Sequence, residues 1–149
     1  MQTFLLVLLS IISLAYVLKT QDYTGHQYEP YAFMISNDYW DAPERQIPGV
    51  RIEHGYANGY VCIQDPNHPM YGRKYWEVDD DGNTLPTPID YLQVHGGVTL
   101  TNQDHGRDGW IIGFDTMHYR DNSLEQDYFY VLKEINSLLQ QVKDYKAEN

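Results

Sequence analysis

The strongest constraint on the fold is a single apolar stripe near the end of the chain. Ser123 and Gln126 form a capping-box pattern that predicts the start of a helix, and Lys143 and Lys146 suit the negative end of its dipole. A helix with one apolar face needs an apolar surface to pack against, so the rest of the domain must supply it. The stripe follows the spacing of one helix face and consists of Tyr128, Val131, Leu132, Ile135, Leu138, Leu139 and Val142.

Short β patterns in the middle of the chain predict that surface. Residues 50–54 alternate apolar and polar, residues 59–63 form a short apolar run, and the turn residues between them predict a hairpin. Residues 110–115 are the most apolar run outside the N-terminus, and their brevity and β-branched content predict a central strand. The expected fold class is therefore α+β: a small, mostly antiparallel sheet with the C-terminal amphipathic helix packed on one face, preceded by an N-terminal apolar helix.

The N-terminal segment carries no charged side chain before Lys19, and Ser10 and Ser13 are the non-apolar side chains within residues 4–18. An uncharged stretch over residues 1–18 reaches the lower length limit for crossing a hydrocarbon core about 30 Å thick. We therefore expect it to anchor the protein in a membrane as a single N-terminal transmembrane helix. The alternatives are export after cleavage of a signal peptide, and a buried element, which so small a domain would have difficulty covering.

We expect the chain to hold one folded domain. Residues 1–19 are the apolar membrane anchor or signal segment, and residues 20–49 are a tyrosine-rich linker in which turn residues separate short runs. The tyrosines of this linker either form a binding face or pack on the domain. Residues 50–146 form the α+β domain.

Charge and cysteine content exclude several classes of function. The chain has 10 Lys and Arg against 21 Asp and Glu, a net charge of -11 and an isoelectric point near 4.7. Such an acidic surface repels phosphate backbones, so we expect no nucleic-acid partner. Cys62 is the single cysteine, which excludes an intramolecular disulfide and a multi-cysteine zinc site.

Four short motifs follow one another along the chain, and together with the C-terminal helix they resemble a family of small, uncharacterised domains common in bacteriophage genomes. The similarity covers about residues 54–142, with two departures: residues 79–88 look like an insertion, and Thr116 stands where many members have a cysteine. The resemblance implies a fold unit and a phage-type origin, and it carries no activity. The motifs are Gly59-Tyr60-Val61, His68-Pro69-Met70-Tyr71-Gly72, Val94-His95-Gly96-Gly97-Val98-Thr99 and Trp110-Ile111-Ile112-Gly113-Phe114-Asp115-Thr116-Met117-His118.

The motif residues at loop and strand ends are the candidate site, because rigid scaffolds display functional groups there. The candidate ligand-binding residues are His68, Tyr71, His95, Gly96, Gly97, Asp115 and His118. The imidazoles of His68, His95 and His118 are also candidate ligands of zinc, with Asp115 able to complete a tetrahedral site. The alternative is that His95 and His118 hydrogen-bond the backbone to fix the loops, with Gly96-Gly97 in a turn or bulge rather than an anion-binding nest.

We expect a membrane-tethered, phage-type accessory domain that binds a small ligand or a partner protein through the histidine-bearing loops, without catalysis and without a cofactor. One alternative is a metal-assisted hydrolase that uses the same residues, with Asp115 or Asp121 as general base. A purely structural or assembly role is the other.

Overall fold

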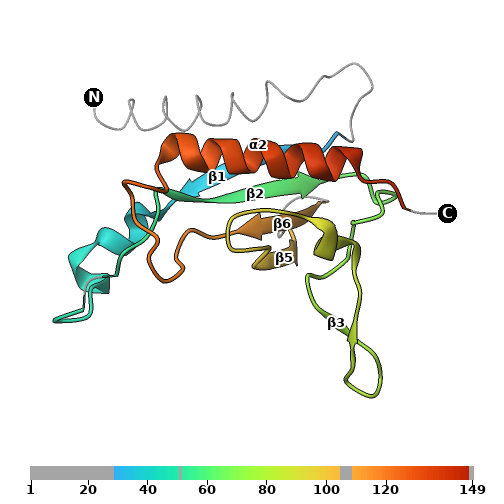
Figure 1. The fold of residues 1–149 in the computed structure, drawn as a ribbon, viewed down its shortest axis with the longest axis horizontal. Helices are drawn as coiled ribbons and strands as arrows, with labels where there is room; N and C mark the ends of the chain where they lie inside the picture. Colours follow the sequence, from blue (N-terminus) through green and yellow to red (C-terminus); the bar gives the residue numbers. More distant parts are fainter. Residues whose placement is uncertain (1–28, 51, 105–108, 148–149) are drawn as a thin grey trace.

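The structure is an antiparallel sheet with one long helix on a face (Figure 1). The computed structural model describes residues 29–50, 52–104 and 109–147. The sheet order is β1-β2-β6-β5, and the helix α2 (Tyr128–Asp144) lies along β1 and β2. The α+β prediction is thus confirmed for the sheet and the C-terminal helix. The strands are β1 (Tyr31–Ser36), β2 (Ala57–Ile63), β5 (Leu100–Gln103) and β6 (Trp110–Phe114), and each neighbouring pair is antiparallel.

The core lies between α2 and the two central strands. The register of β2 and β6 puts Val61 opposite Ile112, and both side chains are fully buried. A Cβ added to Gly59 would lie 2.6 Å from Ile135, so glycine lets the helix approach the sheet closely. Each buried aliphatic side chain contributes about 1.5–3 kcal/mol of transfer free energy. The helix stripe is buried at Val131, Ile135, Leu138 and Val142, as its spacing predicts. Leu132 and Leu139 are half-buried, and Tyr128 at the start of the helix is exposed, so the stripe begins one turn later than the sequence predicts.

The strand β1 falls in the range 20–49 that we expected to be a linker. It pairs along its length with β2, from Tyr31 opposite Cys62 to Ser36 opposite Ala57, and is an edge strand of the sheet. The hairpin predicted between residues 50–54 and 59–63 is not seen among the described residues, because β1 and β6 occupy the two edges of β2. Residues 55 and 56 donate their amides to the carbonyls of Thr116 and Gln126, so loops hold the segment before β2.

The start of α2 also differs from the sequence prediction. Asp127 is the N-cap, and its carboxylate accepts a hydrogen bond from the Tyr130 amide at 2.9 Å. Ser123 is exposed, and the side-chain oxygen of Gln126 accepts from the Asn122 amide at 2.8 Å, which orders the loop before the helix. Near the other end of the helix, Lys143 lies in the last turn, as expected.

Smaller elements complete the described chain. The strands β3 (Glu77–Val78) and β4 (Thr84–Leu85) pair as a short ribbon away from the main sheet (Figure 1). The 3-10 helices are η1 (Asn37–Asp41), η2 (Pro43–Arg45) and η3 (Pro88–Tyr91). The expected N-terminal helix and the segment 1–19 lie outside the described residues. Within residues 29–50, 52–104 and 109–147, no helix is both long and apolar enough to cross a membrane.

Candidate functional site

The first part of the candidate site is a tight turn over residues 94–97. The Gly97 amide donates to the Val94 carbonyl at 2.9 Å, which closes the turn. Gly96 has a φ of 65° and Gly97 a φ of 83°, a region that glycine enters without steric cost. The two glycines therefore let the chain reverse directly after His95 and present its imidazole toward α2.

The second part is the loop that follows β6. The Asp115 carboxylate accepts from the Met117 amide at 3.0 Å, and the Asp121 amide donates to the His118 carbonyl at 2.9 Å. Arg120, the third residue of the turn over 118–121, has a φ of 79°, which costs a side-chain-bearing residue about 1–2 kcal/mol. This tight turn places the His118 ring and the Asp121 carboxylate side by side.

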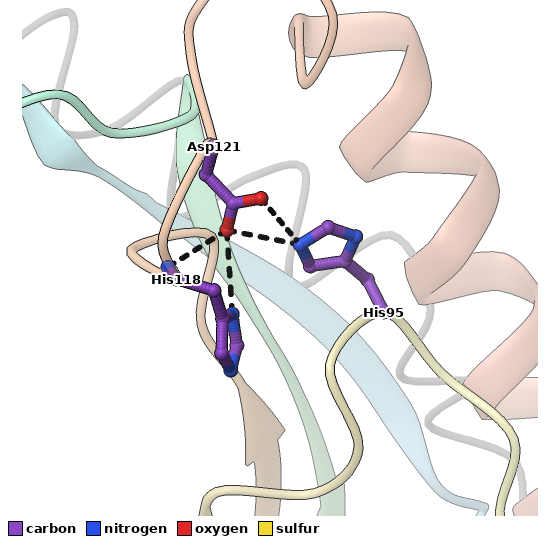
Figure 2. Close-up of side chains that lie close together, drawn as sticks. All are labelled: His95, His118 and Asp121. Atoms are coloured by element: carbon purple, nitrogen blue, oxygen red, sulfur yellow. Dashed lines mark hydrogen bonds and ion pairs between the residues drawn. The ribbon is translucent and has the colours of Figure 1, made fainter.

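The two parts meet at the Asp121 carboxylate, as Figure 2 shows. Nε2 of His95 lies 3.1 Å from Oδ1 and 3.0 Å from Oδ2 of Asp121. Nδ1 of His118 lies 3.3 Å from Oδ2, and the His118 amide donates to the same oxygen at 2.9 Å. The two imidazole rings face this carboxylate from different loops, with their centroids 5.6 Å apart.

The helix α2 holds His95 in place from the other side. Nδ1 of His95 lies 2.8 Å from the Tyr130 hydroxyl, and the His95 amide donates to Oε2 of Glu134 at 2.8 Å. The His118 ring packs directly on Gly96, where an added Cβ would lie 2.2 Å from Cε1 of the ring. Both imidazoles are therefore positioned by contacts outside the cluster as well as within it.

The electrostatics of the cluster favour an ionised Asp121 and a neutral Tyr130. Burial by itself raises the pKa of the Asp121 carboxyl, but hydrogen bonds from the His95 ring and the His118 amide outweigh burial and hold the pKa below its ordinary value. Burial, with the charges of Glu134 and Asp121 adding to it, raises the pKa of the Tyr130 hydroxyl. The site thus combines a fixed negative charge with a hydroxyl that keeps its proton.

Five of the predicted site residues gather here. His95, Gly96 and Gly97 form the turn, while Asp115 and His118 lie on the facing loop, with Oδ1 of Asp115 3.5 Å from Nδ1 of His118. Side-chain exposure is 31% for Asp115 and 37% for His118, so this edge of the cluster is open to solvent.

The structure places His68 and Tyr71 elsewhere. Nε2 of His68 is 2.8 Å from the Val142 carbonyl, and its Nδ1 accepts from the Met70 amide at 3.1 Å. Val142 is roughly 18 Å along the helix from Tyr130, at about 1.5 Å per residue, so His68 cannot share a ligand with His95. Tyr71 packs against Trp110 and the core, with ring centroids 6.4 Å apart.

Sequence motifs do not identify most of the residues that surround His95 at the centre of the cluster. Asp121 is expected there only as an alternative general base, and Tyr130 and Glu134 are not among the predicted site residues. Their side chains meet His95 across sequence separations of 26, 35 and 39 residues. The one local signal is the short spacing of Asp115, His118 and Asp121, because residues this close in a loop can contact one another.

The arrangement suits either recognition or metal binding. His95, His118 and Asp121 each offer one ligand atom, and these atoms all lie within 4.8 Å of one another. Two imidazoles and one carboxylate suit a divalent transition metal and leave coordination positions open. His95 also serves the fold, since its ring and amide join the turn to α2.

Comparison with known proteins adds no identity to this geometry. Searches of protein-family models, of curated proteins and of solved structures found no match to the chain.

Proposed function

We propose that the chain is a phage-type accessory domain that binds a small ligand or a partner protein through the 94–97 turn and the 115–121 loop, without catalysis. One observation carries this proposal: His95 and His118 converge from two loops on the Asp121 carboxylate. Groups that only fixed the loops would not need a solvent-exposed edge, whereas His118 and Asp115 are each about a third exposed. Polar groups held rigidly at such an edge are typical of recognition sites.

The surface beside the cluster fits recognition. Tyr119 is 90% exposed, and the Arg120 guanidinium lies 5.4 Å from its ring. A ligand at this edge would meet an imidazole, a carboxylate, a guanidinium and an aromatic ring within a short stretch of loop. Aromatic and arginine side chains are enriched where proteins bind partners, because both give large contacts with few polar groups to desolvate.

The proposal includes attachment to a membrane through residues 1–18, with export after signal cleavage as the alternative. The support for it is the uncharged, apolar character of this segment in the sequence. The resemblance of residues 54–142 to phage-type domains supports the accessory role in the same way.

A fragment screen by NMR tests the binding function. The full-length, isotope-labelled chain is titrated with a library of fragments that carry imidazole, carboxylate, amine or aromatic groups. We expect the amide shift changes to gather at residues 94–97 and 115–121, and H118Q to weaken these changes. A cluster of shifts in the groove of about 480 Å³ lined by Tyr91, Leu92, Ser137, Gln140, Gln141, Asp144 and Tyr145 would contradict the proposal.

The alternative function, a metal-assisted hydrolase, is favoured by one feature of the site. Three ligand atoms leave open positions at a bound metal, and Asp115 lies at the exposed edge, where a general base would act on a metal-bound water. Hydrolysis of p-nitrophenyl phosphate or p-nitrophenyl acetate that requires zinc and is lost in D115N would establish this alternative. No turnover above that of H118Q would exclude it for these two ester classes.

A further inference from the structure

We propose that His95, His118 and Asp121 form a binding site for a divalent transition metal of the zinc class, with Nε2 of His95, Nδ1 of His118 and the Asp121 carboxylate as ligands. This inference rests on the proposed binding function and names the chemistry of its ligand. It replaces the set expected from the sequence, because His68 binds the helix backbone and Asp121 takes its place.

The distances between the ligand atoms are those of a metal shell. With metal–ligand bonds of about 2.0–2.1 Å, two ligands of a tetrahedral site lie about 3.3 Å apart. The Asp121 Oδ2 atom is 3.0 Å from Nε2 of His95 and 3.3 Å from Nδ1 of His118. The third pair, Nε2 of His95 and Nδ1 of His118, lies within 4.8 Å, so all three groups are close enough to reach one metal ion after side-chain adjustment.

The Tyr130 hydroxyl supports both the metal-free and the metal-bound forms of His95. Without metal, Nε2 of His95 donates its proton to Asp121, and Nδ1 accepts from Tyr130. With metal, the Nε2 lone pair binds the ion, and Nδ1 carries the proton and donates to Tyr130. A hydroxyl can donate or accept, so it suits both tautomers, and a partner that fixes the second ring nitrogen is the usual support of a metal-binding histidine.

Local charge also favours a cation. Asp121 pairs with the two imidazoles, and Glu134 and Asp115 border the same cluster. An anionic ligand would meet three carboxylates here, whereas a divalent cation would be attracted by all of them. Asp115 lies next to His118, where it can hydrogen-bond a metal-bound water.

Zinc titration of the full-length chain, stripped with a chelator beforehand, tests the inference. Calorimetry is expected to show one Zn²⁺ per chain, and H118Q should weaken the binding more than 100-fold. The matched control is H54Q. Nε2 of His54 lies 2.9 Å from Asp41, and among the described residues this imidazole–carboxylate pair belongs to no three-ligand cluster, so its removal should leave the affinity unchanged. Binding that is absent, or equally tight in H118Q, would overturn the metal site.

Nitrogen shifts of the histidine rings give a second readout that needs no variant. On addition of Zn²⁺ to the wild-type chain, the chemical shifts of Nε2 of His95 and Nδ1 of His118 should change to those of metal-bound imidazole. The chemical shifts of both ring nitrogens of His68 should stay unchanged. Shifts at other histidines alone would overturn the assignment.

The metal inference and the binding function fail in distinguishable ways. If zinc does not bind but fragments still gather at residues 94–97 and 115–121, the metal site is wrong and the binding function stands. If zinc binds at His95 and His118 but no fragment or partner does, the metal site stands and the wider binding function is wrong.

Discussion

Gly96 is the residue on which the candidate site depends most directly, because it meets two requirements at once. Its φ of 65° favours a residue without a Cβ, and an added Cβ would collide with the His118 ring. Gly97 has a similar φ of 83°, but an added Cβ there would meet nothing within 4 Å. A side chain at Gly97 would therefore add backbone strain alone, whereas a side chain at Gly96 would add strain and also displace the His118 ring.

Alanine substitution of each glycine should therefore give different results. G97A is expected to lose about 1 kcal/mol of stability through backbone strain alone. G96A carries a similar strain and also displaces the His118 ring, so it should lose more stability and weaken zinc binding. Thermal unfolding and zinc calorimetry on both variants measure the difference. Equal losses of stability with unchanged zinc binding would show that the contact with His118 is unimportant.

The Asp121 carboxyl gives the site a predictable response to acid. Its folded-state pKa is held below the unfolded value, so ionised Asp121 stabilises the fold above the unfolded pKa of about 3.9, and this contribution is lost as pH falls through the folded pKa. We expect D121N to be less stable than wild type at pH 6, and the gap to narrow below pH about 4. Denaturant unfolding at both pH values tests this.

A matched variant distinguishes the contribution of Asp121 from the general loss of stability that an acidic chain shows at low pH. Asp80 is exposed on the 79–83 turn, so D80N should follow the wild-type stability at both pH values. A gap between wild type and D121N that stays constant with pH would mean that the charge of Asp121 does not contribute.

At the scale of elements, the helix α2 shows how a correct pattern can come with a wrong boundary. The stripe from Val131 to Val142 predicts the helix and its buried face, because apolar periodicity reports packing directly. The capping residue, by contrast, is determined by local hydrogen bonds. Asp127 caps the helix in place of Ser123, and the Gln126 side chain accepts a hydrogen bond from the preceding loop.

Substitutions at the two candidate caps should distinguish them. D127A removes the acceptor of the Tyr130 amide and is expected to cost about 1 kcal/mol. S123A changes an exposed loop residue and should stay within about 0.5 kcal/mol of wild type. Chemical denaturation of both variants gives the two values, and a larger loss in S123A would restore the capping box that the sequence predicts.

The strands show why long-range pairing is harder to predict than a single element. Residues 110–115 are identified from their apolar, β-branched run, and the structure makes β6 of residues 110–114 a central strand. The run at Tyr31–Ser36 is also largely apolar, but turn residues flank it and its partner β2 begins at Ala57. A single sequence does not show whether β2 pairs with residues 31–36 or with residues 50–54.

The candidate site follows the same division. His95 and His118 are predicted because they belong to short motifs with glycine and aspartate. Such motifs can be recognised from neighbouring residues in one sequence, without knowledge of the fold. Asp121 as the shared partner and Tyr130 as its support depend on how α2 docks against the 94–97 turn. Tertiary packing determines these contacts, so sequence spacing alone does not predict them.

At the scale of the whole molecule, the Asn37 side chain joins three distant parts of the chain. Asn37 is 2% exposed, and its Nδ2 lies within hydrogen-bonding distance of the Gly55 carbonyl, Oδ1 of Asn58 and Oγ1 of Thr116, at 3.0, 3.2 and 3.1 Å. Thr116 in turn donates to the Ala57 carbonyl at 2.9 Å. This network ties the end of β1 to β2 and to the loop that carries His118.

Removal of this amide should therefore destabilise the whole fold rather than one segment. N37A removes the buried amide that joins the Gly55 carbonyl, Oδ1 of Asn58 and Oγ1 of Thr116, and we expect a loss of about 2–4 kcal/mol in the free energy of unfolding. The exposed neighbour gives the control, because D38A removes no buried group and should stay within about 1 kcal/mol of wild type. A small effect of N37A in a denaturant melt would mean that strand pairing alone holds β1 on the sheet, and that the network does not hold the 115–121 loop in place.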